Sequence, residues 1–419
     1  MFTQKQHLPS YLTYGILAYT FLVSFTRVWF LPVLKASVQP AELLFIPLGL
    51  LAVVHYGKKL IPEKTLAWPL LAYLLVNLAA ALASGQRTAL LETLGRAYLI
   101  GMFLLVLIHV RAVGPTLPSR IMKVWQKGAA VLALLALGGY SLALLGWPNE
   151  SVQVYQNYPY FGTVLRAVGL NGSAGMLVVV LLVPCLWSWY EWRHQGKSGG
   201  WLLLFLVLVV LSLSKEMVLL GLGLLLLEPR VQVLAAGKKM LLIGVTASFF
   251  LLATHWIILP TGSVKNSYLG GTQYSTEKVV LQWGSIQLVE STYLALKRAS
   301  WLIGSQHLPL GVGPGCFNGA LEELKEKGLY PAHLPNYDPH FTWGGAWAET
   351  GLLGFLALVY LSWAGRTQWL KAADPTAPVH RVLGIFLLLL LICSMSMDVM
   401  NFRQLWLVAA LGLASPQVR

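Results

Sequence analysis

An all-α polytopic membrane protein is the fold predicted for this chain of 419 residues. Charged residues make up 11% of the sequence, less than half of the share of about 25% found in soluble domains. Apolar residues form blocks of about 15–25 residues, the length that crosses a bilayer core of about 30 Å. The 16 Trp and 17 Tyr residues gather near the ends of these blocks, as in the aromatic belts of membrane proteins. A soluble globular domain is therefore excluded.

The apolar blocks predict about 12 transmembrane helices. The expected spans are 11–30, 41–57, 67–84, 97–113, 128–147, 170–192, 201–214, 216–228, 240–259, 346–365, 381–397 and 404–416. No small-residue cleavage site follows a short apolar core at the amino terminus. The first block is therefore expected to be a retained span and not a removed signal peptide.

The net charge of +14 comes from Lys and Arg spread over the short loops between apolar blocks. This is the positive-inside pattern, and it predicts that both termini are cytoplasmic. The same spread argues against a nucleic-acid partner, since the basic residues do not gather in one segment. Some Lys and Arg remain on the other face and need a separate explanation.

One apolar run, 201–227, is interrupted by Ser214-Lys215-Glu216. Read as two short helices, it keeps the basic loops that follow on the cytoplasmic side and places Lys215 at the floor of a cavity that opens outward. An ammonium at this depth needs an anionic partner. That partner is either the neighbouring Glu216, in a structural pair, or the phosphate of a lipid.

One large hydrophilic segment, 260–345, is expected to be a periplasmic loop that divides the chain into helices at 1–259 and 346–419. Within the loop, the mixed apolar and polar residues of 278–305 predict a helix on the membrane surface. The sequence Gly-Val-Gly-Pro-Gly at 311–315 predicts a sharp break. A short charged helix is expected at 318–327.

His340 is the first candidate for chemistry, because it stands just before the span at 346–365. A His at a membrane boundary can be a plain anchor, but a pKa near 6.5 also allows it to remove a proton at neutral pH. Glu349 lies nine residues later at membrane depth, where a carboxylate is a functional candidate. A structural bond to Trp or to backbone is the alternative for Glu349.

Further candidates are cations on the outer face. Lys297 and Arg298 are adjacent in the predicted surface helix and are followed by Trp301. Such a pair can simply face anionic headgroups, although a guanidinium suits forked phosphate contacts. Arg166 opens an outward-facing span and is a weaker candidate. No metal site is predicted, since Cys185, Cys316, Cys393 and the His residues have no ligand spacing.

Several of these motifs together resemble a known family. Residues 307–317 read His-Leu-Pro-Leu-Gly-Val-Gly-Pro-Gly-Cys-Phe, His340 follows, and residues 349–354 read Glu-Thr-Gly-Leu-Leu-Gly. This order is similar to that of the O-antigen ligase and O-antigen polymerase superfamily. Ser214-Lys215 stands where that family often has Ser-Arg, and Arg166-Ala-Val-Gly resembles its Arg-x-x-Gly motif. The match in span order and loop position extends over most of the chain.

The sequence departs from the family pattern at three places. Phe341 follows the His where Asn is common, and Lys215 replaces an Arg. In the Arg-x-x-x-Trp motif, Lys297 has the right spacing to Trp301 while Arg298 has the right residue type. We expect Arg298 to be the functional cation of the two.

The resemblance implies a metal-independent, inverting glycosyl transfer without a cofactor, on the periplasmic face of the bacterial inner membrane. The donor would be an undecaprenyl-pyrophosphate-linked glycan and the acceptor the lipid A–core of lipopolysaccharide. His340 would act as the general base or orient the attacking hydroxyl. Lys215 and Arg298, with Arg166, would bind the pyrophosphate. Lys297, Trp301 and Glu349 would line the substrate site.

Two other functions stay open. The first is a different enzyme of the same superfamily, either an O-antigen polymerase or a protein O-oligosaccharyltransferase, and one dominant outer loop favours the ligase over the polymerase. The second is a transporter of lipid-linked sugars. Transporters show repeated halves with broken helices in corresponding positions, and here only the break at 214–216 is visible.

Overall fold

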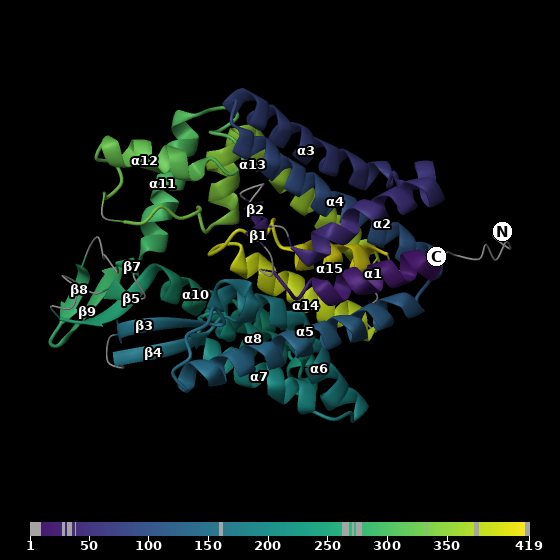
Figure 1. The fold of residues 1–419 in the computed structure, drawn as a ribbon, viewed down its shortest axis with the longest axis horizontal. Helices are drawn as coiled ribbons and strands as arrows, with labels where there is room; N and C mark the ends of the chain where they lie inside the picture. The colour runs from purple at the N-terminus through teal and green to yellow at the C-terminus, as the bar shows by residue number, and fades with distance from the viewer. Residues whose placement is uncertain are drawn as a thin grey trace.

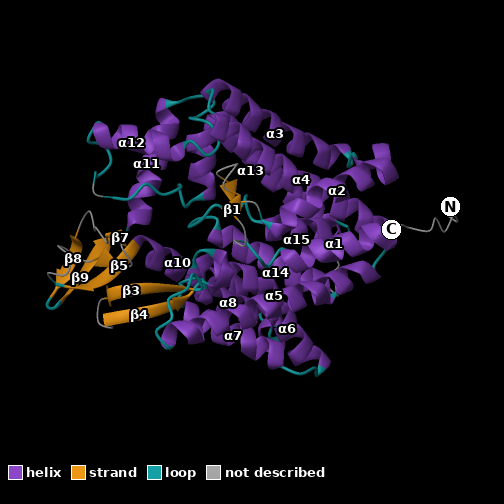
Figure 2. Cartoon of the chain, viewed as in Figure 1, coloured by secondary structure: helices purple, strands orange, loops and turns teal. Residues whose placement is uncertain are grey.

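The computed structural model describes residues 10–26, 30–31, 36–37, 39–158, 162–261, 268–269, 272–273, 279–332, 334–372 and 377–414. Residues 27–29 of the first expected span and 262–267 of the expected outer loop lie outside the described residues. The described chain is a bundle of helices with β-strands gathered at one end (Figures 1 and 2).

A helix lies at each position where the sequence predicts a span. In chain order these helices are α1 (Ser10–Leu22), α2 (Pro40–Tyr56), α3 (Lys64–Ser84), α4 (Arg87–Val113), α5 (Thr116–Leu144), α6 (Ala174–Gln195), α7 (Gly200–Ser212), α8 (Met217–Leu227), α10 (Ala236–His255), α13 (Thr342–Ala372), α14 (Pro378–Cys393) and α15 (Arg403–Leu413).

Among the described residues, 7 helices are long and apolar enough to cross a membrane on their own. These are α2 to α6, α10 and α13, with α2 extended by a 3-10 turn, η2 (Gly57–Leu60). Four other apolar helices, α7, α8, α14 and α15, are shorter, and α1 has 13 residues. The chain is thus a mostly helical, multi-pass membrane protein, and the total of about 12 spans stays a prediction.

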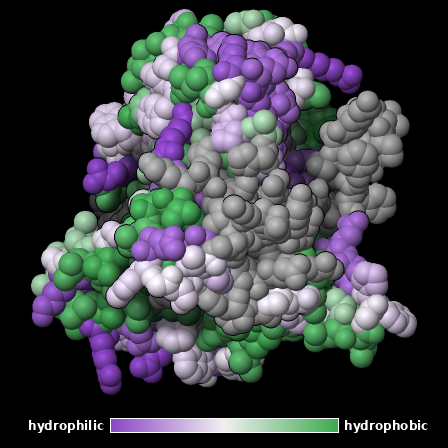
Figure 3. Space-filling view, turned by 90° about the vertical axis from the view of Figure 1, so that its left-hand side faces the viewer, coloured by the Kyte–Doolittle hydropathy of each residue, from purple (hydrophilic) through white to green (hydrophobic). Residues whose placement is uncertain are grey.

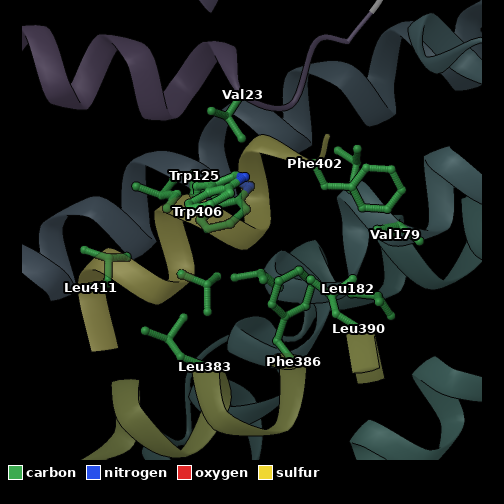
Figure 4. Close-up of a cluster of buried hydrophobic side chains, with 14 of the residues drawn as sticks. Val23, Trp125, Val179, Leu182, Leu383, Phe386, Leu390, Phe402, Trp406 and Leu411 are labelled. Carbon is green, nitrogen blue, oxygen red and sulfur yellow. The ribbon is translucent and has the colours of Figure 1, made fainter. Parts of the chain in front are cut away.

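The hydrophobic core of the bundle forms around α6. In its most apolar stretch 78% of the residues are buried, against 6% for α10. Figure 4 shows side chains of this core, among them Trp125 of α5, Leu182 of α6, Phe386 of α14 and Trp406 of α15. Helix α6 is therefore central in the bundle, and α10 is peripheral with its apolar side chains available to lipid.

The predicted break in the run 201–227 is present between α7 and α8. Leu213 has a φ of 47°, which ends α7 in the left-handed region. The two helices have 13 and 11 residues, about 20 and 17 Å at 1.5 Å per residue. Each is shorter than a bilayer core, so the break at 213–216 lies well inside the span that the two helices make together.

The strands form small antiparallel sheets. Strand β3 (Val152–Tyr158) pairs with β4 (Gly162–Ala167), and β9 (Ile286–Glu290) pairs with both β5 (Trp256–Pro260) and β8 (Val279–Trp283). Two shorter pairs complete the set: β1 (Phe30–Leu31) with β2 (Ala36–Ser37), and β6 (Tyr268–Leu269) with β7 (Thr272–Gln273). Figure 2 shows the two larger sheets side by side at one end of the molecule.

The surface helix predicted for 278–305 is wrong in its first half. Residues 279–290 form β8 and β9, and the helix α11 (Thr292–Gln306) begins only at Thr292. Val279, Val280 and Val289 are β-branched, and Gly284 has the positive φ of 56° that the turn between the strands needs. Similarly, the expected span 240–259 stops at His255 because Trp256 starts β5. The short helix expected at 318–327 is confirmed as α12 (Phe317–Glu326).

The helix ends divide into two sets at opposite ends of the bundle. At one end Arg111 of α4 donates to the Leu413 carbonyl of α15, and Arg381 of α14 donates to Gln232 of the short helix α9 (Pro229–Gln232). The described ends of the chain lie here as well (Figure 1). The sheets, α11 and α12 lie at the opposite end, whose surface mixes hydrophobic and hydrophilic side chains (Figure 3).

Candidate functional site

Three chain segments bring Lys215, Tyr293 and His340 together at the end of the bundle that carries the sheets. The Lys215 ammonium lies 3.9 Å from the centre of the Tyr293 ring. The Tyr293 ring centre is 5.3 Å from that of His340. Tyr293, on α11, therefore connects the break between α7 and α8 with the turn before α13.

Lys215 is held by aromatic rings and not by its sequence neighbour. Besides Tyr293, the ring of Phe250 lies 5.8 Å from the ammonium, and such cation–π contacts stabilise an ammonium that is shielded from water. Glu216 is buried and accepts a hydrogen bond from the Ser214 hydroxyl. Among the described residues, no carboxylate lies within ion-pair distance of Lys215, so the structural pair with Glu216 does not form.

His340 adopts a backbone conformation that is uncommon for a residue with a side chain. Its φ is 47°, and strain of this kind gathers at functional sites. The ring of Tyr337 lies 5.7 Å away. Within the described chain neither imidazole nitrogen has a hydrogen-bond partner. Burial lowers the pKa of His340 below its ordinary value, assisted by Lys215 and opposed by Asp338. A neutral imidazole with free nitrogens is suited to accept a proton.

Lys297 is the second cation of this cluster. Its side chain is buried, with 9% of the residue exposed. The ammonium contacts Nε2 of His255, at the end of α10, and lies 5.0 Å from the ring centre of Phe341. Burial, and then the charge of Lys215, lowers the pKa of Lys297 from 10.5 to about 8. Two ammonium groups close enough to repel each other form a site that an anion would stabilise.

Arg166 lies beside the same helix break. Strand β4 directs its side chain toward α7, where Nε donates to the Ser212 carbonyl at 2.9 Å and Nη1 donates to the Tyr155 hydroxyl at 3.2 Å. The guanidinium also lies 5.2 Å from the Tyr155 ring centre. Arg166 thus caps the carboxyl end of α7, three residues before Lys215, and adds a positive charge to this region.

Arg298 and Trp301 lie apart from these contacts. Arg298 makes a forked ion pair with Glu290 at 2.8 and 2.9 Å, and its side chain is 59% exposed. The Trp301 ring lies 5.4 Å from that of Trp347, which donates to the Trp301 carbonyl. Of the adjacent cations, the structure brings Lys297 and not Arg298 next to His255 and Phe341.

Glu349 is part of a different buried network. Its carboxylate accepts from Arg96 of α4 at 2.9 Å, and Arg96 also donates to Asn77 of α3. The peptide N–H of Gly313 donates to the Glu349 carbonyl at 2.8 Å. These contacts join α3, α4, α13 and the glycine-rich segment, so Glu349 has a structural partner at membrane depth.

Four residues of these two clusters were missed by reasoning from the sequence: Tyr293, Tyr337, His255 and Arg96. Tyr293 could have been found, because it lies four residues before Lys297 and therefore on the same face of α11. His255 could have been found by the same signal as His340, because it stands at the end of an apolar block and His340 stands just before one. Arg96 directly precedes the expected span 97–113, and a buried cation at the edge of an apolar block requires a partner.

The arrangement combines Lys215, Lys297 and Arg166 with a neutral histidine and several aromatic rings. The described residues contain no group of three His, Cys, Asp or Glu side chains placed to hold a metal ion. The cations can bind an anionic group such as a diphosphate, and His340 can take a proton from a hydroxyl beside it.

No protein-family model matches this chain, and no curated protein matches it significantly. The resemblance to the O-antigen ligase and polymerase superfamily therefore rests on the sequence motifs at 166–169, 214–215, 307–317, 340 and 349–354.

Proposed function

We propose that this chain is an O-antigen ligase, which transfers a glycan from undecaprenyl pyrophosphate to the lipid A–core of lipopolysaccharide. One observation carries the proposal: at one end of an apolar bundle, Lys215 and His340 both lie against the ring of Tyr293, and Lys297 lies beside Phe341, the residue after His340. Their chemistry matches a reaction in which a hydroxyl loses a proton while a pyrophosphate leaves.

In this reaction the acceptor hydroxyl oxygen attacks the anomeric carbon of the donor glycan. The new glycosidic bond forms as the bond between that carbon and the phosphate oxygen breaks, with inversion at the carbon. His340 takes the hydroxyl proton: its lowered pKa keeps the imidazole neutral at neutral pH, and a neutral ring nitrogen can accept the proton. The electron pair of the broken bond leaves on the pyrophosphate, whose added charge Lys215, Lys297 and Arg166 stabilise.

The same proposal includes the membrane topology: about 12 spans in the bacterial inner membrane, both termini in the cytoplasm, and residues 260–345 in the periplasm. It is supported by the grouping of the helix ends. Arg111, Arg193 and Arg381 lie in the terminal turns of α4, α6 and α14 at the end opposite the sheets, as the positive-inside pattern requires of a cytoplasmic face. The two short helices α7 and α8 would put Lys215 within reach of a lipid pyrophosphate from the outer side.

The proposal is tested with purified protein in detergent, an undecaprenyl-pyrophosphate glycan, lipid A–core and excess EDTA. Transfer is read as a shift of the acceptor on a gel. We expect wild type to transfer in EDTA, and His340→Ala to lose at least about a hundredfold, since general-base catalysis contributes about 10²–10⁴. His194→Ala is the matched control, because His194 is exposed at the opposite end of the bundle.

Other products would lead to other functions. A donor glycan that grows longer while lipid A–core stays unmodified would assign the chain as a polymerase. A glycan attached to a protein acceptor instead would make it a protein O-oligosaccharyltransferase. Folded wild type that makes none of these products, but moves the lipid-linked glycan across a vesicle membrane, would replace the enzyme by a transporter.

A further inference from the structure

A buried ion pair connects α4 with α13 away from the Lys215 cluster. Arg96 Nη2 and Glu349 Oε2 are 2.9 Å apart, and the two side chains are 8% and 10% exposed. Arg96 also donates to Asn77, whose amide donates in turn to the Tyr73 carbonyl at 2.7 Å. The charges are therefore compensated within the protein, and each depends on the other, since an unpaired charge at this depth is costly.

The glycine loop, residues 311–315, lies directly on this ion pair. Val312 donates to the Ala348 carbonyl at 3.0 Å and Gly313 to the Glu349 carbonyl at 2.8 Å. Gly311, Gly313 and Gly315 have φ values of 71°, 100° and 70°. A Cβ at Gly311 would collide with the backbone of Ala348 and Glu349, one at Gly313 with Ser84 of α3, and one at Gly315 with Glu92 of α4. The positive φ angles and these close contacts both favour glycine.

His340 lies just before the first residue of the helix segment that carries Glu349 near its other end. Helix α13 is broken at Gly351, whose φ is 64°, so residues 342–350 form a separate segment about 13 Å long. Thr342 fixes its start by bonds to the Ser394 and Met397 carbonyls at 3.0 and 2.9 Å. Glu349 fixes its end. His340 lies two residues before Thr342, so its position depends on both attachments.

We propose that Arg96 and Glu349 are positioning residues that dock the glycine loop and hold the segment 342–350, and with it His340, in register with Lys215. Neither residue touches the substrate in this proposal. The docking of the loop stands on the contacts above, whereas its effect on transfer rests on the proposed function. Two readouts keep these parts separate.

A native thiol reports the docking of the loop. Cys316 directly follows the loop and is buried against Ala81 of α3 and Ala89 of α4. Burial raises the pKa of its thiol, which further slows its reaction with maleimides. The other cysteines of the chain, Cys185 and Cys393, are buried inside the bundle. A loop that comes away exposes Cys316, whereas global unfolding exposes all three.

The first experiment measures labelling by a water-soluble maleimide, located by mass spectrometry, in wild type, Glu349→Gln and Glu349→Ala. We expect Cys316 to label about tenfold faster in Glu349→Ala, with Glu349→Gln between it and wild type, while Cys185 and Cys393 stay protected. The matched control removes a comparable ion pair away from the loop, Glu42 with Arg403: Glu42→Ala should leave Cys316 at the wild-type rate.

Where Glu349→Ala labels at all three cysteines, the double variant Arg96→Met with Glu349→Met decides, because it leaves no charge unpaired. Labelling of Cys316 alone in the double variant supports the proposal. Wild-type protection of Cys316 in a folded variant, or labelling of all three cysteines in both variants, overturns it.

The second experiment measures transfer by the same proteins. A positioning role lowers kcat by about tenfold or more and leaves KM for the donor nearly unchanged, because the misplaced group is not a binding group. Arg96→Lys, which keeps the charge beside Glu349, should lose less of kcat than the double variant Arg96→Met with Glu349→Met. An exposed Cys316 together with a wild-type kcat would reject the positioning of His340 but not the docking of the loop. No transfer by wild type, with Cys316 opening as expected, would reject the proposed function and keep the docking.

Discussion

Lys297 is expected to matter more for transfer than Arg298, although the two are adjacent. Lys297 is buried beside His255 and Phe341, while Arg298 is engaged with Glu290 and exposed. Lys297→Ala should lower kcat/KM by about a hundredfold, the usual effect of removing one charge-stabilising group. Arg298→Ala should cost less than about threefold. The gel-shift assay on both variants checks this, and an equal loss in the two would contradict the assignment.

The pH dependence of transfer follows from His340 and Lys297. Because burial lowers the pKa of His340, the imidazole loses its proton at a pH below 6.5. The acid limb of the kcat/KM profile, where activity rises with pH, should therefore lie below pH 6.5. The value of kcat/KM should fall again as Lys297, with a pKa of about 8, loses its charge. The expected profile is a bell with its plateau near neutral pH.

Lys297→Arg provides the control for the alkaline limb, because a guanidinium keeps its proton throughout this range. In this variant the limb should move to higher pH while the acid limb stays in place. An alkaline limb that is the same in wild type and in Lys297→Arg would assign it to another group.

The candidate site was predictable from the sequence in its residue types but not in its pairings. His340, Lys215 and Arg166 stand out because a charge or an imidazole near an apolar block needs a partner. Which partner each finds depends on contacts between distant segments, as in Lys215 with Tyr293 or Glu349 with Arg96. The choice between Lys297 and Arg298 shows the same limit: their neighbours differ by one helical position, and only the placement of α11 decides which side chain faces inward.

Substitution of Gly351 tests whether the fold requires the break in helix α13. Its φ of 64° is unfavourable for any other residue, and a Cβ here would collide with the Pro309 carbonyl. Gly351→Ala should lower the free energy of unfolding by about 2 kcal/mol or more, the sum of backbone strain and a forced shift of the packed loop. The measurement is the thermal midpoint in detergent.

Gly365 is the matched control in the same helix. It has no atom within 4 Å of an added Cβ, and it lies in a regular stretch of α13. Gly365→Ala should be neutral or stabilising by up to about 1 kcal/mol, since Ala favours the helix. Similar losses in the two variants would mean that the break at Gly351 is not required by the fold.

At this scale the apolar helices were predictable and the strands were not. Long apolar runs identify helices because a membrane leaves few other ways to satisfy the backbone. Outside such runs the pattern is ambiguous: 279–290 mixes apolar and polar residues in a way that fits a surface helix, and the turn at Gly284 is a short signal within it. The extension of α4 back to Arg87 and of α13 to Ala372 was also missed, because these turns are polar and only their hydrogen bonds continue the helix.

The orientation of the whole molecule depends on the break at 213–216, and cysteine labelling tests both. With α7 and α8 as two helices, Arg193 and Lys239 belong to turns on the same side of the membrane, whereas a single continuous helix would put them on opposite sides. Single variants Arg193→Cys, Lys239→Cys and Lys327→Cys are treated with a membrane-impermeant maleimide in right-side-out vesicles. Because Cys185, Cys316 and Cys393 are buried, the background should be low.

We expect Lys327→Cys to label in intact vesicles and the other two variants to label only after the membrane is opened. This result would place 260–345 outside and both sets of basic turns inside, in agreement with the positive-inside pattern. Labelling of Lys239→Cys in intact vesicles, with Arg193→Cys protected, would mean that residues 201–227 cross once. Lys215 would then lie at mid-membrane without access from the outer side, and the proposed pyrophosphate site could not form.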